Sequence, residues 1–264
     1  MAEEFADGDA YERFMGRWSR LAAASFVAWL DLPGGLLWLD VGCGTGALAA
    51  AVVTGAEPRG VLAVDRSAPF VAAARRSTTG APVGLAVADA SALPVADGAV
   101  DVTASGLVLN FLPDAAAAVR EQVRVVVPAG TVAAFVWDYA DGMQALRLFW
   151  QAVAAVDPEH AALDEAARFP LCRPETLRSL WLEAGLGGVT GHPLDVRRRF
   201  ASFDELWEPF LGGQGPAGHY LAGLGGGERS RVADEFRRRL PVAPDGSVEL
   251  SARAWAVRGS RWGR

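Results

Sequence analysis

The chain has 264 residues, of which 51% are hydrophobic, contains neither lysine nor isoleucine, and carries a net charge of −6 at pH 7. Because P-loop nucleotide hydrolases, protein kinases and Schiff-base enzymes all need a lysine amine, these mechanisms are excluded. A GC-rich gene explains the missing lysines, so we attach no functional meaning to them. The negative charge offers no long-range attraction to nucleic acid or to an anionic membrane.

The two cysteines, Cys43 and Cys172, lie far apart and form no C-x-x-C pair. This excludes a zinc ribbon or a disulfide scaffold and favours a reducing cytoplasm. The first four residues are acidic where a signal peptide is basic, and the longest lipid-compatible stretch, residues 21–30, falls short of the ~20 residues that span a bilayer. We therefore expect a cytoplasmic protein without a membrane partner.

The first predicted element is a helix over residues 18–30, which ends at Pro33-Gly34-Gly35. From residue 36 short apolar runs alternate with alanine-rich helical stretches, which is typical of βαβ units around a parallel sheet. We predict strands at 36–41, 61–65, 83–88, 100–105 and 131–137, and helices at 46–54, 67–77 and 114–127.

After residue 137 the regular alternation stops. Residues 140–170 have a helical pattern, followed by a helix at 174–184, a strand at 189–196, a helical stretch at 203–240 and a last strand at 247–257. The two late strands predict an antiparallel hairpin at one edge. The expected fold is an α/β, Rossmann-like, doubly wound seven-stranded sheet, mostly parallel with an antiparallel C-terminal edge strand, plus a helical cap. We expect one domain, 1–264, with a helical leader (1–35), a ligand-binding core (36–138), the cap (139–185) and C-terminal strands with a helical insertion at 203–240 (186–264).

Three alternate glycines, Gly42, Gly44 and Gly46, directly follow the strand at 36–41 and precede a helix. Such glycines let the chain turn sharply and let a ligand lie against main-chain amides, while the helix N-terminus adds a partial positive charge. The same residues, followed by Ala47, also fit the dinucleotide fingerprint. The loop alone therefore leaves two kinds of cofactor open.

Carboxylates stand at the ends of three successive predicted strands: Asp40, Asp65 and Asp89, the last followed by Ala90. Each alone is as readily an ordinary turn residue. Together they form a row along the crevice where open α/β sheets bind ligands, and their order matches an ammonium, a ribose and an adenine. Asp40 would repel a pyrophosphate, which disfavours a dinucleotide.

At these residues the sequence resembles the class I S-adenosylmethionine-dependent methyltransferases, over about residues 11–138. The stretch at 89–101 is similar to the ubiquinone and menaquinone biosynthesis-type branch, with Val100 in place of the usual Phe. The resemblance implies S-adenosylmethionine as cofactor, with the methionine part on the backbone of residues 42–46. It also places Arg66 beside the adenine, and we count Cys43, Ala90 and Leu107 among the cofactor-binding residues.

The segment at 11–19 resembles the leader of such enzymes, in which a Tyr and an Arg fold over the cofactor. The resemblance implies that Tyr11 closes the pocket and that Arg17 pairs with the cofactor carboxylate. The alternative, that both are ordinary surface residues, stays open.

Two residues are candidates for contact with the methyl acceptor. Asn110, the only asparagine, follows the fourth strand, and its amide can orient an acceptor but cannot serve as a general base. Asp138 follows the fifth strand and could accept a proton, with Trp137 and Tyr139 packing on a planar acceptor; loop capping and core packing are the alternatives. No histidine pair has metal-ligand spacing, so we expect no metal.

We predict a cytoplasmic methyltransferase that moves a methyl group from S-adenosylmethionine to an O, N or C atom of a small-molecule acceptor, as a monomer or homodimer without a nucleic-acid partner. The alternatives are an NAD-type oxidoreductase and a non-catalytic S-adenosylmethionine-binding regulatory module.

Overall fold

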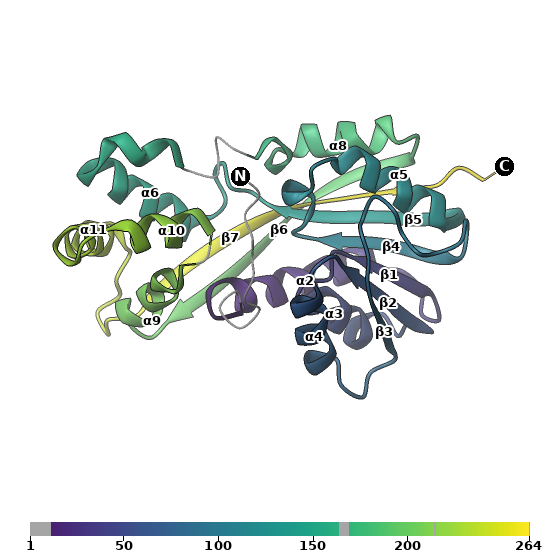
Figure 1. Cartoon of the computed structure of the whole chain (residues 1–264), viewed down its shortest axis with the longest axis horizontal. Helices are drawn as coiled ribbons and strands as arrows, with labels where there is room; N and C mark the ends of the chain where they lie inside the picture. The colour runs from purple at the N-terminus through teal and green to yellow at the C-terminus, as the bar shows by residue number, and fades with distance from the viewer. Residues whose placement is uncertain (1–11, 164–168, 214, 264) are drawn as a thin grey trace.

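The computed structural model describes residues 12–163, 169–213 and 215–263, and shows one seven-stranded sheet in the order β3-β2-β1-β4-β5-β7-β6 (Figure 1). The strands are β1 (Leu37–Val41), β2 (Gly60–Asp65), β3 (Val83–Val87), β4 (Val100–Gly106), β5 (Val126–Trp137), β6 (Gly187–Phe200) and β7 (Val248–Ser260). The first five strands are parallel, and β7 runs antiparallel to both of its neighbours. The predicted doubly wound, mostly parallel sheet is confirmed.

The C-terminal hairpin forms as expected, but β7 lies inside the sheet and β6 forms the edge. Most side chains of β6 are exposed, whereas those of β7 are largely buried. Pro193 in β6 has no backbone N–H, and Arg197 to Arg199 add charge, both of which suit an edge strand. The last strand, β7, therefore lies between β5 and β6 and pairs with both.

Helices cover both faces of the sheet (Figure 1). One face carries α2 (Arg17–Leu30), α3 (Ala47–Gly55) and α4 (Ala68–Ser77), and the other carries α5 (Ala115–Val125) and α8 (Pro174–Glu183). Two of these helices begin at side-chain caps: Ser67 accepts a hydrogen bond from the Phe70 amide at 3.4 Å, and Asp114 accepts one from the Ala117 amide at 2.8 Å. These caps fix the helices that follow the ligand-facing ends of β2 and β4.

The cap lies beyond the carboxyl end of β5 and is built from two distant segments (Figure 1). It consists of α6 (Gln144–Val156), α9 (Phe203–Trp207), α10 (Gly215–Gly223) and α11 (Gly226–Arg239), with the short helices η3 (Pro158–Leu163) and η5 (Glu208–Gly212). Aromatic rings fill its centre, where Phe149 stacks on Phe210 at 5.0 Å and Phe210 meets Phe236 at 5.6 Å.

Helix α8, which we expected in the cap, packs on the sheet instead. Leu177 and Trp181 are almost fully buried, and the indole N–H of Trp181 donates a hydrogen bond to the Val132 carbonyl of β5 at 2.9 Å. The apolar stripe of α8 therefore belongs to the core of the sheet, and the 139–185 segment divides between cap and sheet.

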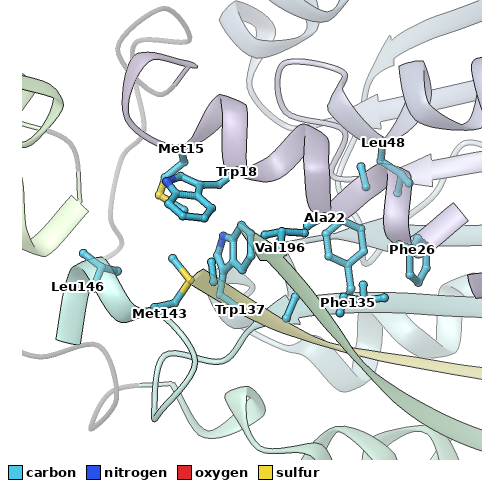
Figure 2. Packing of buried hydrophobic residues seen from close by; sticks show 14 of the residues in the cluster. Met15, Trp18, Ala22, Phe26, Leu48, Phe135, Trp137, Met143, Leu146 and Val196 are labelled. Atoms are coloured by element: carbon cyan, nitrogen blue, oxygen red, sulfur yellow. The ribbon is translucent and has the colours of Figure 1, made fainter. Parts of the chain in front are cut away.

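The leader helix α2 joins the sheet to the cap (Figure 2). Phe26 contacts Phe135 of β5 at a ring distance of 4.7 Å, and Trp18 lies 6.1 Å from Phe200 of β6. Because Phe26 is fully buried, its replacement by Ala would cost about 3–5 kcal/mol. This packing sets α2 firmly against the end of the sheet where the predicted ligand residues lie.

Candidate cofactor site

The loop between β1 and α3 has a shape that only glycine allows. Gly42, Gly44 and Gly46 have φ values of +77°, +51° and +92°, which other residues rarely adopt. A Cβ on Gly42 would also lie 2.6 Å from Val108. The amides of Gly42 and Cys43 both donate to the Val64 carbonyl of β2, at 2.8 and 2.9 Å. These hydrogen bonds fix the loop at the carboxyl ends of β1 and β2.

Two cavities adjoin at this loop. The smaller, about 100 Å³, lies between the loop and α2, and the larger, about 730 Å³, lies over the ends of β2 and β3. Both are lined by Gly42, Asp65, Phe70 and Val108. An elongated ligand can therefore occupy both cavities at once.

Asp40 faces the smaller cavity and is 2% exposed. Neither of its carboxylate oxygens has a hydrogen-bond partner among the described residues. Burial raises the pKa of Asp40 to about 8; the Ala49 amide, which faces the carboxylate without meeting hydrogen-bond geometry, partly offsets this, and the charge of Asp65 adds to it. An unpaired, ionised carboxylate in this position favours binding of a cationic group and repels a phosphate.

Asp65 lies where the two cavities meet. Its Oδ2 accepts a hydrogen bond from the Gly44 amide at 2.9 Å, and its Oδ1 accepts one from the Ser67 amide at 2.8 Å. Because each carboxylate oxygen can accept two hydrogen bonds, both retain room for a ligand hydroxyl.

Asp89 stands at the rim of the larger cavity, next to the buried Ala90. Its Oδ1 accepts hydrogen bonds from the Ser91 hydroxyl at 2.5 Å and from the Ser91 amide at 2.7 Å. These bonds lower the pKa of Asp89, and the charge of Arg66 contributes a smaller part. Asp89 is therefore ionised at neutral pH, and its Oδ2 is left without a hydrogen-bond partner in the described chain.

Comparison with known proteins reveals the family. A model described as "Methyltransferase domain" matches residues 39–134. The 2-phytyl-1,4-naphtoquinone methyltransferase of Thermosynechococcus vestitus is 30% identical over 189 residues, which cover 67% of this chain and 82% of that protein. The chain belongs to this methyltransferase family.

Other relatives and structural neighbours match different parts of this chain. The malonyl-[acyl-carrier protein] O-methyltransferase of Methylococcus capsulatus is 34% identical over 116 residues, 44% of this chain and 42% of that protein. The first curated relatives are matched over only 26% to 42% of their own length. A solved structure of phosphoethanolamine N-methyltransferase 2 from Haemonchus contortus, in complex with S-adenosyl-L-methionine, aligns with 97% of this chain and 57% of that protein. The identity is 16% and the TM-score is 0.57, which shows that the two share a fold.

Most of the expected cofactor residues line these cavities. Cys43, Gly44 and Leu107 line the smaller one, and Arg66, Asp89 and Ala90 the larger. Gly46 shapes the loop without lining either cavity in this structure, and Tyr11 lies outside the described residues. Leu107 has a φ of +63°, and its amide donates to the Phe135 carbonyl at 2.8 Å, so the chain after β4 turns sharply around the cavity.

Arg17 is turned away from both cavities. Its side chain is 63% exposed and pairs with Glu205 of α9 at 3.2 Å. The structure therefore brings Arg17 to the junction of leader and cap, where it lines neither cavity.

The two candidates for contact with a methyl acceptor, Asn110 and Asp138, also line neither cavity. Asn110 lies in the short helix η2 (Leu109–Phe111), and its buried Oδ1 has no hydrogen-bond partner among the described residues. Asp138 accepts a hydrogen bond from the Asp141 amide at 3.0 Å, and its carbonyl accepts those of Gly142 and Met143. Asp138 thus builds the turn between β5 and α6.

One leader contact was not indicated by the sequence. The Glu12 carboxylate accepts a hydrogen bond from the Thr45 hydroxyl in the glycine loop and pairs with Arg20 of α2. A single acidic residue next to the expected Tyr11 forms no pattern, so only the tertiary structure brings it to the loop. Through it, the leader is fastened to the glycine loop.

The described ranges contain no cluster of three or more His, Cys, Asp or Glu side chains able to hold a metal ion. No helix within them is long and apolar enough to cross a membrane.

Proposed function

We propose that this chain transfers the methyl group of S-adenosylmethionine to an O, N or C atom of a small-molecule acceptor by in-line displacement. The observation that carries the proposal is the row of Asp40, Asp65 and Asp89 at the carboxyl ends of β1, β2 and β3, along two adjoining cavities. Its order suits an ammonium, a ribose and an adenine.

The residues present fit the cofactor at each end. The unpaired, buried carboxylate of Asp40 would hold the ammonium, which supplies the missing counter-charge. Asp65 would accept hydrogen bonds from the ribose hydroxyls with the acceptor capacity that its two amide partners leave. The free oxygen of Asp89 would accept from the adenine amino group, and the Ala90 amide would donate to a ring nitrogen.

The cofactor supplies an activated methyl group on a sulfonium, so the chain has little covalent chemistry to perform. Its task is to hold the acceptor ~3–3.5 Å from the methyl carbon and to exclude water. Phe111 at the larger cavity meets Phe169 at 5.1 Å, and Phe169 meets Tyr139 after β5 at 5.2 Å. These rings suit an apolar or aromatic acceptor. Asn110 is our candidate for orienting that acceptor, because its buried Oδ1 lacks a partner among the described residues.

We place the chain in the cytoplasm, as a monomer or homodimer acting on a small molecule rather than on nucleic acid. Cys43 and Cys172 are both free thiols, as expected in a reducing compartment. The net charge of −6 is unfavourable for a polyanionic partner.

Titration calorimetry tests the proposal against the dinucleotide alternative. At about pH 8.5, where Asp40 is largely ionised, S-adenosylhomocysteine, the product form of the cofactor, should bind and NADH should not, because the Asp40 carboxylate opposes a pyrophosphate. Asp65→Ala should weaken S-adenosylhomocysteine at least about tenfold, since hydrogen bonds to a charged group contribute about 1.5–3 kcal/mol. The matched control is Asp234→Ala, an exposed carboxylate on α11, which should leave the affinity unchanged. Binding of NADH alone would overturn the proposal.

A further inference from the structure

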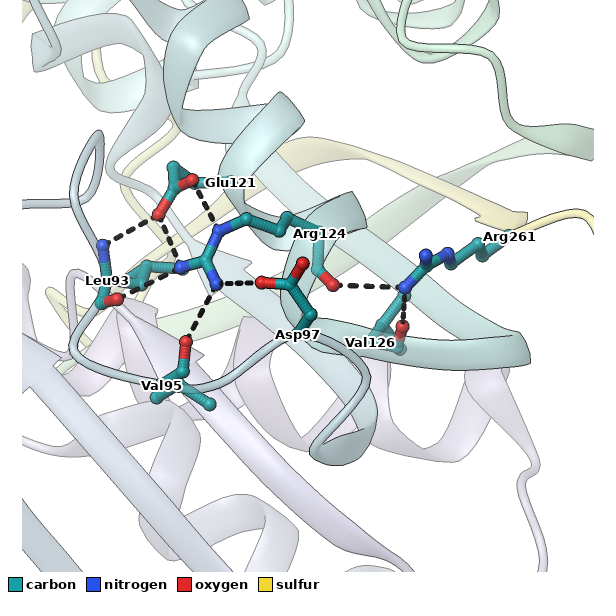
Figure 3. A network of polar contacts seen from close by, with 7 residues as sticks. All are labelled: Leu93, Val95, Asp97, Glu121, Arg124, Val126 and Arg261. Atoms are coloured by element: carbon teal, nitrogen blue, oxygen red, sulfur yellow. Dashed lines mark hydrogen bonds and ion pairs between the residues drawn. The ribbon is translucent and has the colours of Figure 1, made fainter.

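The loop between β3 and β4, residues 88–99, carries the adenine side of the site and is fastened to helix α5 by the side chain of Arg124 (Figure 3). The guanidinium donates hydrogen bonds to the Leu93 carbonyl at 3.1 Å and to the Val95 carbonyl at 2.9 Å, and it pairs with Asp97 at 2.6 Å. One side chain thus contacts three points along the loop.

Glu121, one turn earlier on α5, completes this anchor. It receives two hydrogen bonds from Arg124, Nε to Oε1 at 2.7 Å and an NH₂ group to Oε2 at 2.8 Å, and its Oε2 also accepts the Leu93 amide at 2.9 Å. The hydrogen bonds from Arg124 lower the pKa of Glu121. Leu93 is therefore held through both its N–H and its carbonyl, immediately after the residues that line the larger cavity.

The anchor is supported from behind by a second arginine near the end of the chain (Figure 3). Arg261 donates from one guanidinium nitrogen to the Arg124 carbonyl at 3.0 Å and to the Val126 carbonyl at 2.6 Å. The loop is tied to the same backbone, because the Gly98 amide donates to the Arg124 carbonyl at 3.0 Å. The junction of α5 and β5 is fixed, so the Arg124 side chain projects from a rigid base.

Helix α5 is at once a wall of the larger cavity and the base of this anchor. Ala118 of α5 and Asp114 at its cap line the same cavity as Asp89 and Ala90 of the loop. The distance across the cavity therefore depends on how the loop is held against α5. A lone surface ion pair contributes little to stability, but this arrangement is a bidentate Arg–Glu pair with four further bonds to one loop.

We propose that Arg124 and Glu121 are positioning residues for adenine recognition: they hold the 88–99 loop so that the free oxygen of Asp89 and the Ala90 amide face the base. The proposal rests on the proposed function, since it takes the larger cavity as the adenine site. Neither side chain touches the ligand, and their effect passes through the backbone at Leu93 and Val95.

The experiment compares two ligands, S-adenosylhomocysteine and S-inosylhomocysteine, whose 6-oxo group and protonated N1 reverse the hydrogen-bond pattern of adenine. The unchanged chain should prefer the adenosyl ligand at least about tenfold, because Asp89 and Ala90 would otherwise face the wrong partners. In Arg124→Gln this preference should fall to about threefold or less, because the loop no longer fixes both groups. The control Arg178→Gln, an exposed arginine of α8, should keep the full preference.

The ratio of the two affinities separates positioning from mere stabilisation. A general loss of folded protein weakens both ligands equally and leaves the ratio unchanged, so an unchanged ratio in Arg124→Gln overturns the proposal. If Arg124→Gln does not fold, Glu121→Gln serves instead; it removes one charge, keeps an acceptor for the Leu93 amide, and should give an intermediate ratio. Failure of the unchanged chain to bind S-adenosylhomocysteine would instead overturn the proposed function, and this proposal with it.

Discussion

Asp40 should link cofactor binding to proton release, and Asp40→Asn is the perturbation that exposes this link. The carboxyl is 2% exposed, has no hydrogen-bond partner among the described residues, and has a pKa of about 8, so about nine-tenths of the free protein carries the proton at pH 7. A bound ammonium requires the ionised form. Binding should therefore release roughly 0.9 proton at pH 7 and almost none at pH 9.

The raised pKa of Asp40 also determines how the stability of the folded protein changes with pH. The unfolded chain loses this proton near its ordinary value of 3.8, whereas the folded chain keeps it until about pH 8. Between these values the folded state binds more protons, so Asp40 makes the protein less stable as the pH rises, by about 5 kcal/mol in total for a shift of ~4 units. Asp40→Asn should remove this loss and raise the melting temperature of the free protein above that of the unchanged chain at pH 8 or higher.

The affinity for the ligand, in contrast to the stability of the free protein, should rise with pH. The affinity of the unchanged chain for S-adenosylhomocysteine should rise about tenfold per pH unit up to pH 8, and Asp40→Asn should bind with no such slope. At pH 8 the variant should bind about 100-fold more weakly, because a buried charge then lacks its partner, and the gap should narrow toward pH 6. Calorimetry in buffers of different ionisation enthalpy measures both quantities. Heats that do not depend on the buffer at pH 7, with a flat affinity from pH 6 to 8, would refute the reasoning.

Three further substitutions test other parts of the site by calorimetry and thermal melting. Gly42→Ala places a Cβ 2.6 Å from Val108 at a φ of +77°, so it should abolish S-adenosylhomocysteine binding and cost about 1–3 kcal/mol; retained binding would show that the loop shape is dispensable. Asn110→Ala should leave the cofactor affinity within about twofold, because the side chain lines neither cavity, and should slow methyl transfer; a tenfold loss of cofactor affinity would move Asn110 into the cofactor site. Arg17→Ala, which breaks an exposed pair with Glu205, should change stability by less than about 1 kcal/mol and leave cofactor affinity unchanged, whereas tenfold weaker binding would restore its role at the cofactor carboxylate.

The sheet was predictable because hydrophobic runs and glycine breaks are local signals, and the first four strands lie within one residue of their predicted bounds. The fifth, β5, begins at Val126, inside the stretch predicted as helix. The order of β6 and β7 in the sheet was not predictable in the same way, because it depends on which of the two strands is buried on both faces. Pro193 in β6 nevertheless indicates an edge strand, because proline cannot donate a backbone hydrogen bond. Helix α8 was predicted as a helix but assigned to the cap, since an apolar stripe shows that a face is buried and not what covers it. Only the contact of Trp181 with β5 shows that the sheet covers this face of α8.

The cofactor side of the site could be predicted further than the acceptor side. Asp40, Asp65 and Asp89 owe their positions to strand ends, and parallel strands bring their ends together whatever the rest of the chain does. Arg17 depends on a long-range partner, Glu205 in the cap, and no pattern along the sequence encodes that pairing. Asp138 accepts hydrogen bonds from the turn that directly follows it, which leaves it outside both cavities.

The central claim, methyl transfer from S-adenosylmethionine, is tested most directly by incubating the chain with methyl-labelled cofactor and a fractionated extract of small metabolites. The account predicts label in at least one small-molecule fraction, with an equal amount of S-adenosylhomocysteine formed, and a large loss of both with Asp65→Ala but not with Asp234→Ala. Tight binding of the cofactor with no labelled product in any fraction would contradict it and identify the chain as a silent binder.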